Sequence, residues 1–248
     1  MSPRHLSVAV TLGILAQAAI ADAAPVNGIT LPDRGPFGKR IALTFDDGPH
    51  STRTAAILNV LRRHNAPAIF FVQGKNLVTP AACDRLNEIM ASGCLIGNHT
   101  KNHPNCARLT TQAFQQEVEA CQTAIAQVTG QRPTFFRYPY GAATAATHQV
   151  LSDKSLRHVG WSIDTNDWWY AGPKTTPVPG MPDMYRNDFL GWTLRQVEAR
   201  EGGVMLMHDI HNFTAQNLET LLTALEGRGY RFVRIDDAQT FPNLNAPR

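Results

Sequence analysis

The stretch IALTFDDGPHSTRTAAILNVLRRH, residues 41–64, contains the signals for a strand, a turn and a helix in immediate succession. Its first residues are apolar or β-branched and predict a buried strand, after which Gly48-Pro49 turns the chain away. The rest of the stretch carries apolar side chains at helical spacing. It therefore predicts one strand–helix unit of an α/β fold, with two adjacent carboxylates, Asp46 and Asp47, where the strand ends.

The same alternation continues along the chain. We expect strands at residues 41–45, 68–72, 94–97, 134–137, 158–163, 203–207 and 231–235. Helical periodicity covers residues 52–64, 80–91, 110–129, 143–153, 191–200 and 215–228. Alternating strands and helices imply parallel strands, and a distorted TIM-like (β/α)7 barrel is the simplest architecture. A doubly wound open sheet is the alternative, and both folds place functional residues at the carboxyl ends of strands.

The first 23 residues are expected to be a signal peptide. Arg4 and His5 precede an apolar run at residues 6–20, and Ala21-Asp22-Ala23 offers a small-x-small cleavage site. No later run is long and apolar enough for a membrane span, so we expect one soluble domain at residues 24–248, secreted or periplasmic, monomeric and without a membrane anchor. A net charge of +3 with scattered basic residues argues against a nucleic-acid partner.

Four cysteines lie close together in the sequence, without the spacing of a zinc knuckle. In an exported protein they favour two disulfides. Matching the heights of the four positions along the barrel favours Cys83 with Cys106 and Cys94 with Cys121, while other connectivities and four buried free thiols stay open.

Polar residues capable of chemistry follow the first and third predicted strands. Asp46 and Asp47 can divide the work, one binding a cation while the other handles a proton, although a helix cap or Asx-turn would explain either one alone. His99 and His103 are four residues apart, which places them on one face of a helical turn. Asp47, His99 and His103 together make the two-His-one-carboxylate set of a catalytic metal site.

Later strand ends add a cation and an acid. Arg137 can hold a neighbouring carboxylate ionised, or merely pair with a surface acid. His208, beside an Asp from the adjacent strand end, forms an oriented acid pair. A proline-rich connection lies between Trp168 and Gly191, and its Trp169 and Tyr170 either stack on sugar rings or pack beneath the loop.

Five ordered motifs now resemble those of the polysaccharide deacetylases, carbohydrate esterase family 4, which share the NodB-homology domain. They are T-F-D-D at 44–47, H-T-x-x-H at 99–103, R-x-P-Y at 137–140, D-x-x-D-W at 164–168 and L-x-H-D at 206–209. The resemblance covers roughly residues 38–237.

The resemblance implies a role for each matching residue. Asp46 would be the general base, oriented by Arg137, and His208 the general acid, tuned by Asp164. The set of metal ligands would be Asp47, His99 and His103, holding one divalent cation, with zinc favoured and cobalt or another transition metal as alternatives. The substrate contacts would be Leu206 in the acetyl pocket, Trp168 in the groove wall and the backbone N–H of Tyr138 at the oxyanion.

The implied reaction is metal-dependent hydrolysis of N-acetyl groups from a polysaccharide containing N-acetylglucosamine, of the chitin or peptidoglycan type, with release of acetate. The partner would be an acetylated polysaccharide. One alternative is an acetyl xylan esterase that removes O-acetyl groups. The other, a non-catalytic sugar-binding protein, would have no use for the base and acid.

Overall fold

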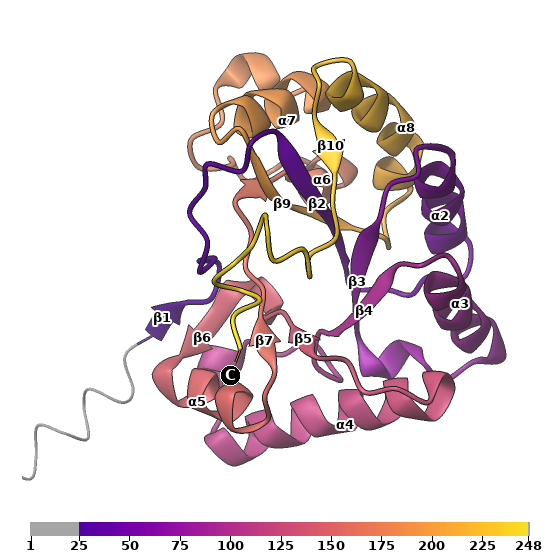
Figure 1. Ribbon diagram of the computed structural model, residues 1–248, viewed down its shortest axis with the longest axis vertical. Helices are drawn as coiled ribbons and strands as arrows, with labels where there is room; N and C mark the ends of the chain where they lie inside the picture. The colour runs from indigo at the N-terminus through magenta and orange to yellow at the C-terminus, as the bar shows by residue number, and fades with distance from the viewer. Residues whose placement is uncertain (1–24, 248) are drawn as a thin grey trace, which may run out of the picture.

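A computed structural model describes residues 25–247, so the predicted signal peptide lies outside the described part of the chain. Its centre is a curled, parallel, eight-stranded sheet in the order β7-β5-β4-β3-β2-β9-β8, with β10 paired to the start of β2 (Figure 1). The strands are β2 (Arg40–Asp46), β3 (Ala68–Val72), β4 (Leu95–Asn98), β5 (Phe135–Phe136), β7 (Arg157–His158), β8 (Ile163–Asp164), β9 (Gly202–His208) and β10 (Arg231–Phe232).

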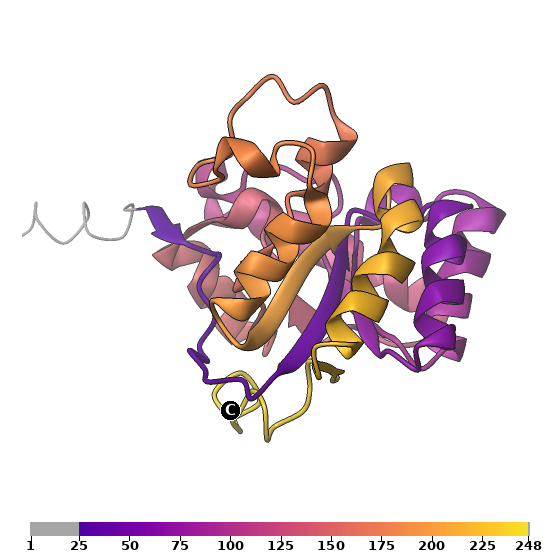
Figure 2. The same ribbon diagram turned by 90° about the horizontal axis from the view of Figure 1, so that it is seen from above.

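Helices pack around the outside of the curled sheet (Figures 1 and 2). They are α2 (Arg53–Arg63), α3 (Pro80–Ala91), α4 (Thr111–Thr129), α5 (Ala145–Asp153), α6 (Asp167–Ala171), α7 (Phe189–Glu198) and α8 (Asn212–Glu226), with short 3-10 turns η1 (Gly74–Asn76), η2 (Cys106–Arg108), η3 (Pro139–Gly141) and η4 (Asp183–Tyr185). The predicted distorted barrel is confirmed, as a curled sheet that completes only part of a barrel.

The central strand β2 is buried on both faces, which explains its continuous apolar run. Ile41, Leu43 and Phe45 belong to the large cluster that includes core residues of α2 and α8. Ala42 belongs to a second cluster, with core residues of β3 and β9. Because side chains alternate along a strand, Asp46 faces the same side as Ala42, the inside of the barrel.

The single strand predicted at residues 158–163 is wrong, because this segment changes partners along its length. Val159 N–H donates to the carbonyl of Phe136 on β5, whereas Ser162 N–H donates to the carbonyl of Val204 on β9. Between them the N-terminal arm intervenes: Trp161 N–H donates to the carbonyl of Ile29. The segment therefore forms two short strands, β7 and β8, at the two edges of the sheet, and the barrel stays open between them.

The arm that fills this gap begins with a strand that the sequence did not predict. β1 (Pro25–Asn27) pairs antiparallel with β6 (Ala142–Thr144), and Gly28 N–H donates to the carbonyl of Gly141. Gly160 lies so close to the arm that a Cβ there would be 1.8 Å from the Ile29 oxygen. The close approach requires glycine at this position.

The predicted disulfides are wrong, because all four cysteines are free thiols in the structure. Cys106 is buried in the cluster around Phe114, whereas Cys94 and Cys121 are buried in the large cluster. The Cys121 thiol donates to the carbonyl of Val72. Its predicted partner Cys94 instead bonds the backbone at Ala68, the opposite end of β3. Cys106 is buried in its own cluster, whereas its predicted partner Cys83 is partly exposed.

The connection between α6 and α7 stands out from the rest of the molecule in Figure 2. Trp169 and Tyr170 are buried at its base. Trp169 Nε1–H donates to the carbonyl of Thr176 and the Tyr170 hydroxyl to that of Tyr185. Of the two predicted roles, packing beneath the loop is therefore confirmed.

We predict that Gly97→Ala destabilises the fold. A Cβ on Gly97 of β4 would lie 2.4 Å from the ring of Phe71, which is buried inside the barrel. Overpacking of this kind costs about 1–3 kcal/mol in the free energy of unfolding, measured by denaturant titration. Gly227→Ala at the end of α8, where the added Cβ meets only ordinary contacts, is the matched control and should be close to neutral. Equal stability of the two variants would contradict the packing.

Candidate active site

Two adjacent carboxylates converge at the end of β2 because the chain leaves regular strand geometry there. Asp46 is the last residue of the strand and points into the barrel. Asp47 follows in the left-handed region, with φ of 78°. This turn breaks the alternation that would otherwise send the two side chains to opposite faces. The predicted convergence of Asp46 and Asp47 at one mouth follows from this single backbone angle.

The two histidines lie in an irregular loop after β4, and the expected helical turn is wrong. His103 itself has a positive φ of 62°. The rings nevertheless lie 4.9 Å apart, and His103 Nε2 and His99 Nε2 approach Asp47 Oδ1 at 3.2 and 3.5 Å. His99 Nδ1 lies 2.8 Å from the carbonyl of Arg137. A carbonyl can only accept, so His99 Nδ1 carries a proton, and Nε2 is the ring nitrogen that faces Asp47.

Asp47, His99 and His103 fit a metal ion. Their ligand atoms all lie within 4.8 Å of one another. Burial alone would raise the pKa of Asp47, but hydrogen bonding and charge from His99 hold that pKa well below its usual range. Burial and the charge of His99 lower the pKa of His103 to about 4. Asp47 and His103 are therefore deprotonated at neutral pH, the form that a divalent cation requires.

Arg137, which follows β5, is fully buried, so the alternative of a surface ion pair is wrong. Its Nη1 donates to Asp46 Oδ1 at 2.8 Å and to Thr44 Oγ1 at 2.6 Å. Its Nε and Nη2 donate to the carbonyls of Val159 and Gly160. The guanidinium therefore aims the Asp46 carboxylate and bridges the open edge of the barrel with one side chain.

His208, at the end of β9, lies beside β2, with Asp46 as its partner in the strand register. Its Nδ1 lies 2.7 Å from Asp167 Oδ1, and its N–H donates to Asp167 Oδ2. Burial alone would lower the pKa of His208, but the charge and hydrogen bond of Asp167 raise it to about 10. The pair therefore stabilises the fold fully below about pH 6.5, and that contribution is lost as the pH rises through about 10.

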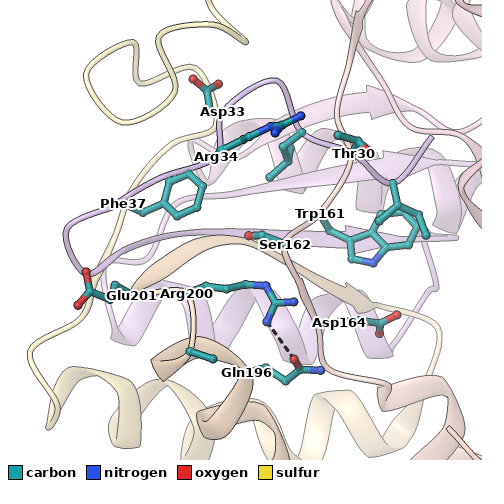
Figure 3. Close-up of a pocket in the computed structure, with 13 residues that line it drawn as sticks. Thr30, Asp33, Arg34, Phe37, Trp161, Ser162, Asp164, Gln196, Arg200 and Glu201 are labelled. Atoms are coloured by element: carbon teal, nitrogen blue, oxygen red, sulfur yellow. Dashed lines mark hydrogen bonds between the residues drawn. The ribbon is translucent and has the colours of Figure 1, made fainter. Parts of the chain in front are cut away.

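The predicted pairing of Asp164 with His208 is wrong, because Asp167 takes that place. Asp164 Oδ1 instead accepts from the N–H of Asn166. Asp164 also lines a pocket of about 680 Å³ along the open edge of the barrel, together with Trp161 and Ser162 (Figure 3). The backbone reverses at Asn166, whose φ is 55°, and this brings Asp167 rather than Asp164 to the imidazole.

The three predicted substrate contacts lie around this centre. Leu206 is buried on β9, two residues before His208 and therefore on the same face of the strand. Trp168 on α6 is 45% exposed. The side chain of Tyr138 is buried, and its N–H donates no hydrogen bond to protein atoms among residues 25–247. The N–H is therefore available as a donor, and the predicted oxyanion contact stays a prediction.

Sequence reasoning missed two carboxyl groups at the site, Asp167 and Asp209. Asp167 is the second acid of the D-x-x-D-W motif, so the signal was present but was assigned to the first acid. Asp209 directly follows His208 and accepts a hydrogen bond from the Thr54 hydroxyl, and burial raises its pKa to about 7. Its carboxyl packs directly against Gly48, in the turn that carries Asp47.

We predict that Asp167→Asn lowers the pKa of His208 by about 1–3 pH units, because an opposite charge at hydrogen-bond distance is removed. NMR titration of the imidazole in the metal-free protein measures this pKa. Asp164→Asn, the matched control, removes a carboxylate that does not bond His208 and should change that pKa less. A larger fall in Asp164→Asn than in Asp167→Asn would contradict the observed pairing.

Comparisons with known proteins agree with this geometry. The family profile for polysaccharide deacetylase matches residues 33–159. Over 80% of its length the chain is 38% identical to a peptidoglycan-N-acetylglucosamine deacetylase of Listeria monocytogenes, and it spans 38% of that longer protein. It is 30% identical to a chitooligosaccharide deacetylase of Azorhizobium caulinodans, over 77% of this chain and 90% of that one.

A solved structure extends the likeness to three dimensions. The family 4 carbohydrate esterase from Streptomyces lividans, in complex with acetate, superposes with a TM-score of 0.67 at 28% identity. The alignment covers 82% of this chain and 95% of that one. By its five motifs, its curled parallel sheet and its matching profile, the chain belongs to the polysaccharide deacetylase family.

Proposed function

We propose that this protein is a metal-dependent deacetylase that hydrolyses N-acetyl groups of a polysaccharide containing N-acetylglucosamine and releases acetate. The observation that carries the proposal is the pairing of two proton-transfer groups beside three metal ligands. Asp46, held by Arg137, and His208, held by Asp167, both lie at the barrel mouth near Asp47. A protein that only binds sugars needs neither an oriented base nor an oriented acid.

Asp47, His99 and His103 would hold one divalent cation, and their two imidazoles favour zinc among the metals of this chemistry. Bound there, the cation would polarise the acetyl carbonyl and bring the pKa of water down to about 7. Three protein ligands leave coordination positions open, as a catalytic rather than a structural site requires.

Asp46 would act as the general base. Its side chain is 5% exposed and is aimed by the Arg137 guanidinium, so it can take a proton from the attacking water without rotating out of place. The free N–H of Tyr138 would donate to the oxygen that gains charge as the acetyl carbon becomes tetrahedral.

His208 would act as the general acid. With a pKa of about 10 it holds its proton at neutral pH, and its Nδ1 is fixed by Asp167, which leaves Nε2–H to donate. An amine leaves poorly unless its nitrogen is protonated, whereas an alcohol or phenol leaves more readily. An acid that carries its proton at neutral pH therefore favours an N-acetyl over an O-acetyl substrate.

Two observations support this class of substrate: the names of similar proteins and the exposed aromatic rings at the mouth of the barrel. Similar proteins are named for peptidoglycan and for chitooligosaccharide, both of which contain N-acetylglucosamine. Trp168 and Tyr140, 45% and 67% exposed, offer aromatic faces for sugar rings, and the Tyr140 ring lies 4.6 Å from that of His103. Leu206 would contact the acetyl methyl.

The cellular setting is part of the proposal. Residues 1–23 would direct export, leaving residues 24–248 as a monomeric catalytic domain that is secreted or periplasmic and meets acetylated polysaccharide there. Among residues 25–247, no helix is long and apolar enough to cross a membrane.

Acetate release tests the proposed function. The purified mature chain, incubated with chitin oligomers, peptidoglycan and acetylated xylan, should release acetate from the N-acetylated polymers. Release should stop after treatment with a chelator and return when zinc is added. Binding of these polymers without any acetate release, or release that resists the chelator, would contradict the proposal. Release from xylan alone would identify an esterase.

Asp46→Asn tests whether Asp46 acts as the base without binding the metal. The variant should keep its metal but lose about 10²- to 10⁴-fold in turnover, because only the proton acceptor is removed. Asp84→Asn, an exposed carboxylate on α3, is the matched control and should retain activity. Metal analysis and acetate release measure the two effects, and full turnover in Asp46→Asn would place the base elsewhere.

A further inference from the structure

Gln73 lies outside the five motifs but hydrogen-bonds directly to the carboxylate of Asp47, one of the three proposed metal ligands. It follows β3 directly and its side chain is 5% exposed. Its Nε2 lies 2.5 Å from Asp47 Oδ1. A carboxylate only accepts hydrogen bonds, so the amide nitrogen, rather than the amide oxygen, must face Asp47.

The oxygen that Gln73 contacts is the one that faces both histidines. Asp47 Oδ1 lies 3.2 Å from His103 Nε2 and 3.5 Å from His99 Nε2. A carboxylate oxygen has two lone pairs, so Oδ1 can accept from Gln73 on one side and still present a lone pair to a cation on the other. The amide therefore selects which Asp47 oxygen points into the site.

The same short segment also holds the backbone on which Asp47 stands. Gln73 N–H donates to the carbonyl of Gly48, and Asn76 Nδ2 donates to the carbonyls of Asp47 and Gly48 at 2.7 and 3.0 Å. Asp47 has the unfavourable φ of 78°, so its side chain depends on outside contacts to stay in place. Both residues hold the turn, and among residues 25–247 other than the proposed metal ligands, Gln73 is the one whose side chain donates to the Asp47 carboxylate.

We propose that Gln73 is a positioning residue for the metal centre, setting the orientation of the Asp47 carboxylate and thereby the affinity for the cation. The inference rests on the proposed function, because it assumes that Asp47, His99 and His103 bind metal. Outer hydrogen bonds to metal ligands fix their orientation, and losing one typically weakens metal affinity about 10- to 100-fold.

Gln73→Met tests the role, since methionine keeps the length of the side chain and removes the donor. The Kd for zinc, measured on the mature chain by competition with a chromogenic chelator, should rise about 10- to 100-fold. The Tm in excess EDTA should match that of the wild type, while the rise in Tm on adding zinc should shrink. Gln115→Met, an exposed glutamine on α4, is the matched control and should bind zinc like the wild type.

Gln73→Asn repeats the test with a polar side chain, in case methionine is not tolerated at this position. It keeps the amide but is one methylene shorter, so its N–H falls short of Asp47, and the Kd for zinc should again rise. Wild-type zinc affinity in a folded Gln73 variant would overturn the positioning role alone. A lower Tm in EDTA with unchanged zinc affinity would show a purely structural role and also overturn it. Failure of the wild type to bind zinc would overturn the proposed function and this role together.

Discussion

The buried guanidinium of Arg137 is the interaction on which the site and the barrel both depend. Its side chain bonds Asp46 and the carbonyls of the segment between β7 and β8, and it packs 4.3 Å from the centre of the Phe71 ring. Its own carbonyl accepts from His99 and so orients the imidazole of a proposed metal ligand. Burial lowers the pKa of Arg137, and the adjacent Asp46 carboxylate opposes that effect. Removing one partner of such a buried pair costs about 3–5 kcal/mol, because a charge is left unpaired.

Several residues at the mouth of the barrel have unfavourable backbone φ angles. Positive φ angles occur where the loops carry the site residues, at Asp47, Thr100, His103, Tyr140 and Asn166. Each costs about 1–2 kcal/mol for a residue with a Cβ, and hydrogen bonds offset the cost. Thr100 N–H donates to Asn98 Oδ1, and His103 N–H donates to Thr100 Oγ1. These local hydrogen bonds hold the loops in place and preorganise the proposed metal ligands and proton-transfer groups.

Much of this arrangement could be predicted from the sequence, because strand ends in a parallel sheet meet at one mouth. That rule brought Asp47, His99, Arg137 and His208 together without knowledge of their contacts. It failed where side-chain direction decided the outcome. The left-handed turn at Asn166 placed Asp167 rather than Asp164 beside His208, and the thiols of Cys94 and Cys121 bond the backbone at opposite ends of β3. It also failed where a distant segment intervened, since nothing near residue 160 signals that the N-terminal arm divides the strand.

Anomalous diffraction at the zinc edge, from crystals of the chain grown with zinc, tests the central claim most directly. The account predicts one strong peak at the mouth of the barrel, about 2.0–2.2 Å from His99 Nε2, His103 Nε2 and an oxygen of Asp47. The electron-density map from the same crystals should show Asp46 bonded to Arg137 and not coordinated to the zinc. A peak held by other residues, or the absence of any peak at these three side chains, would contradict it.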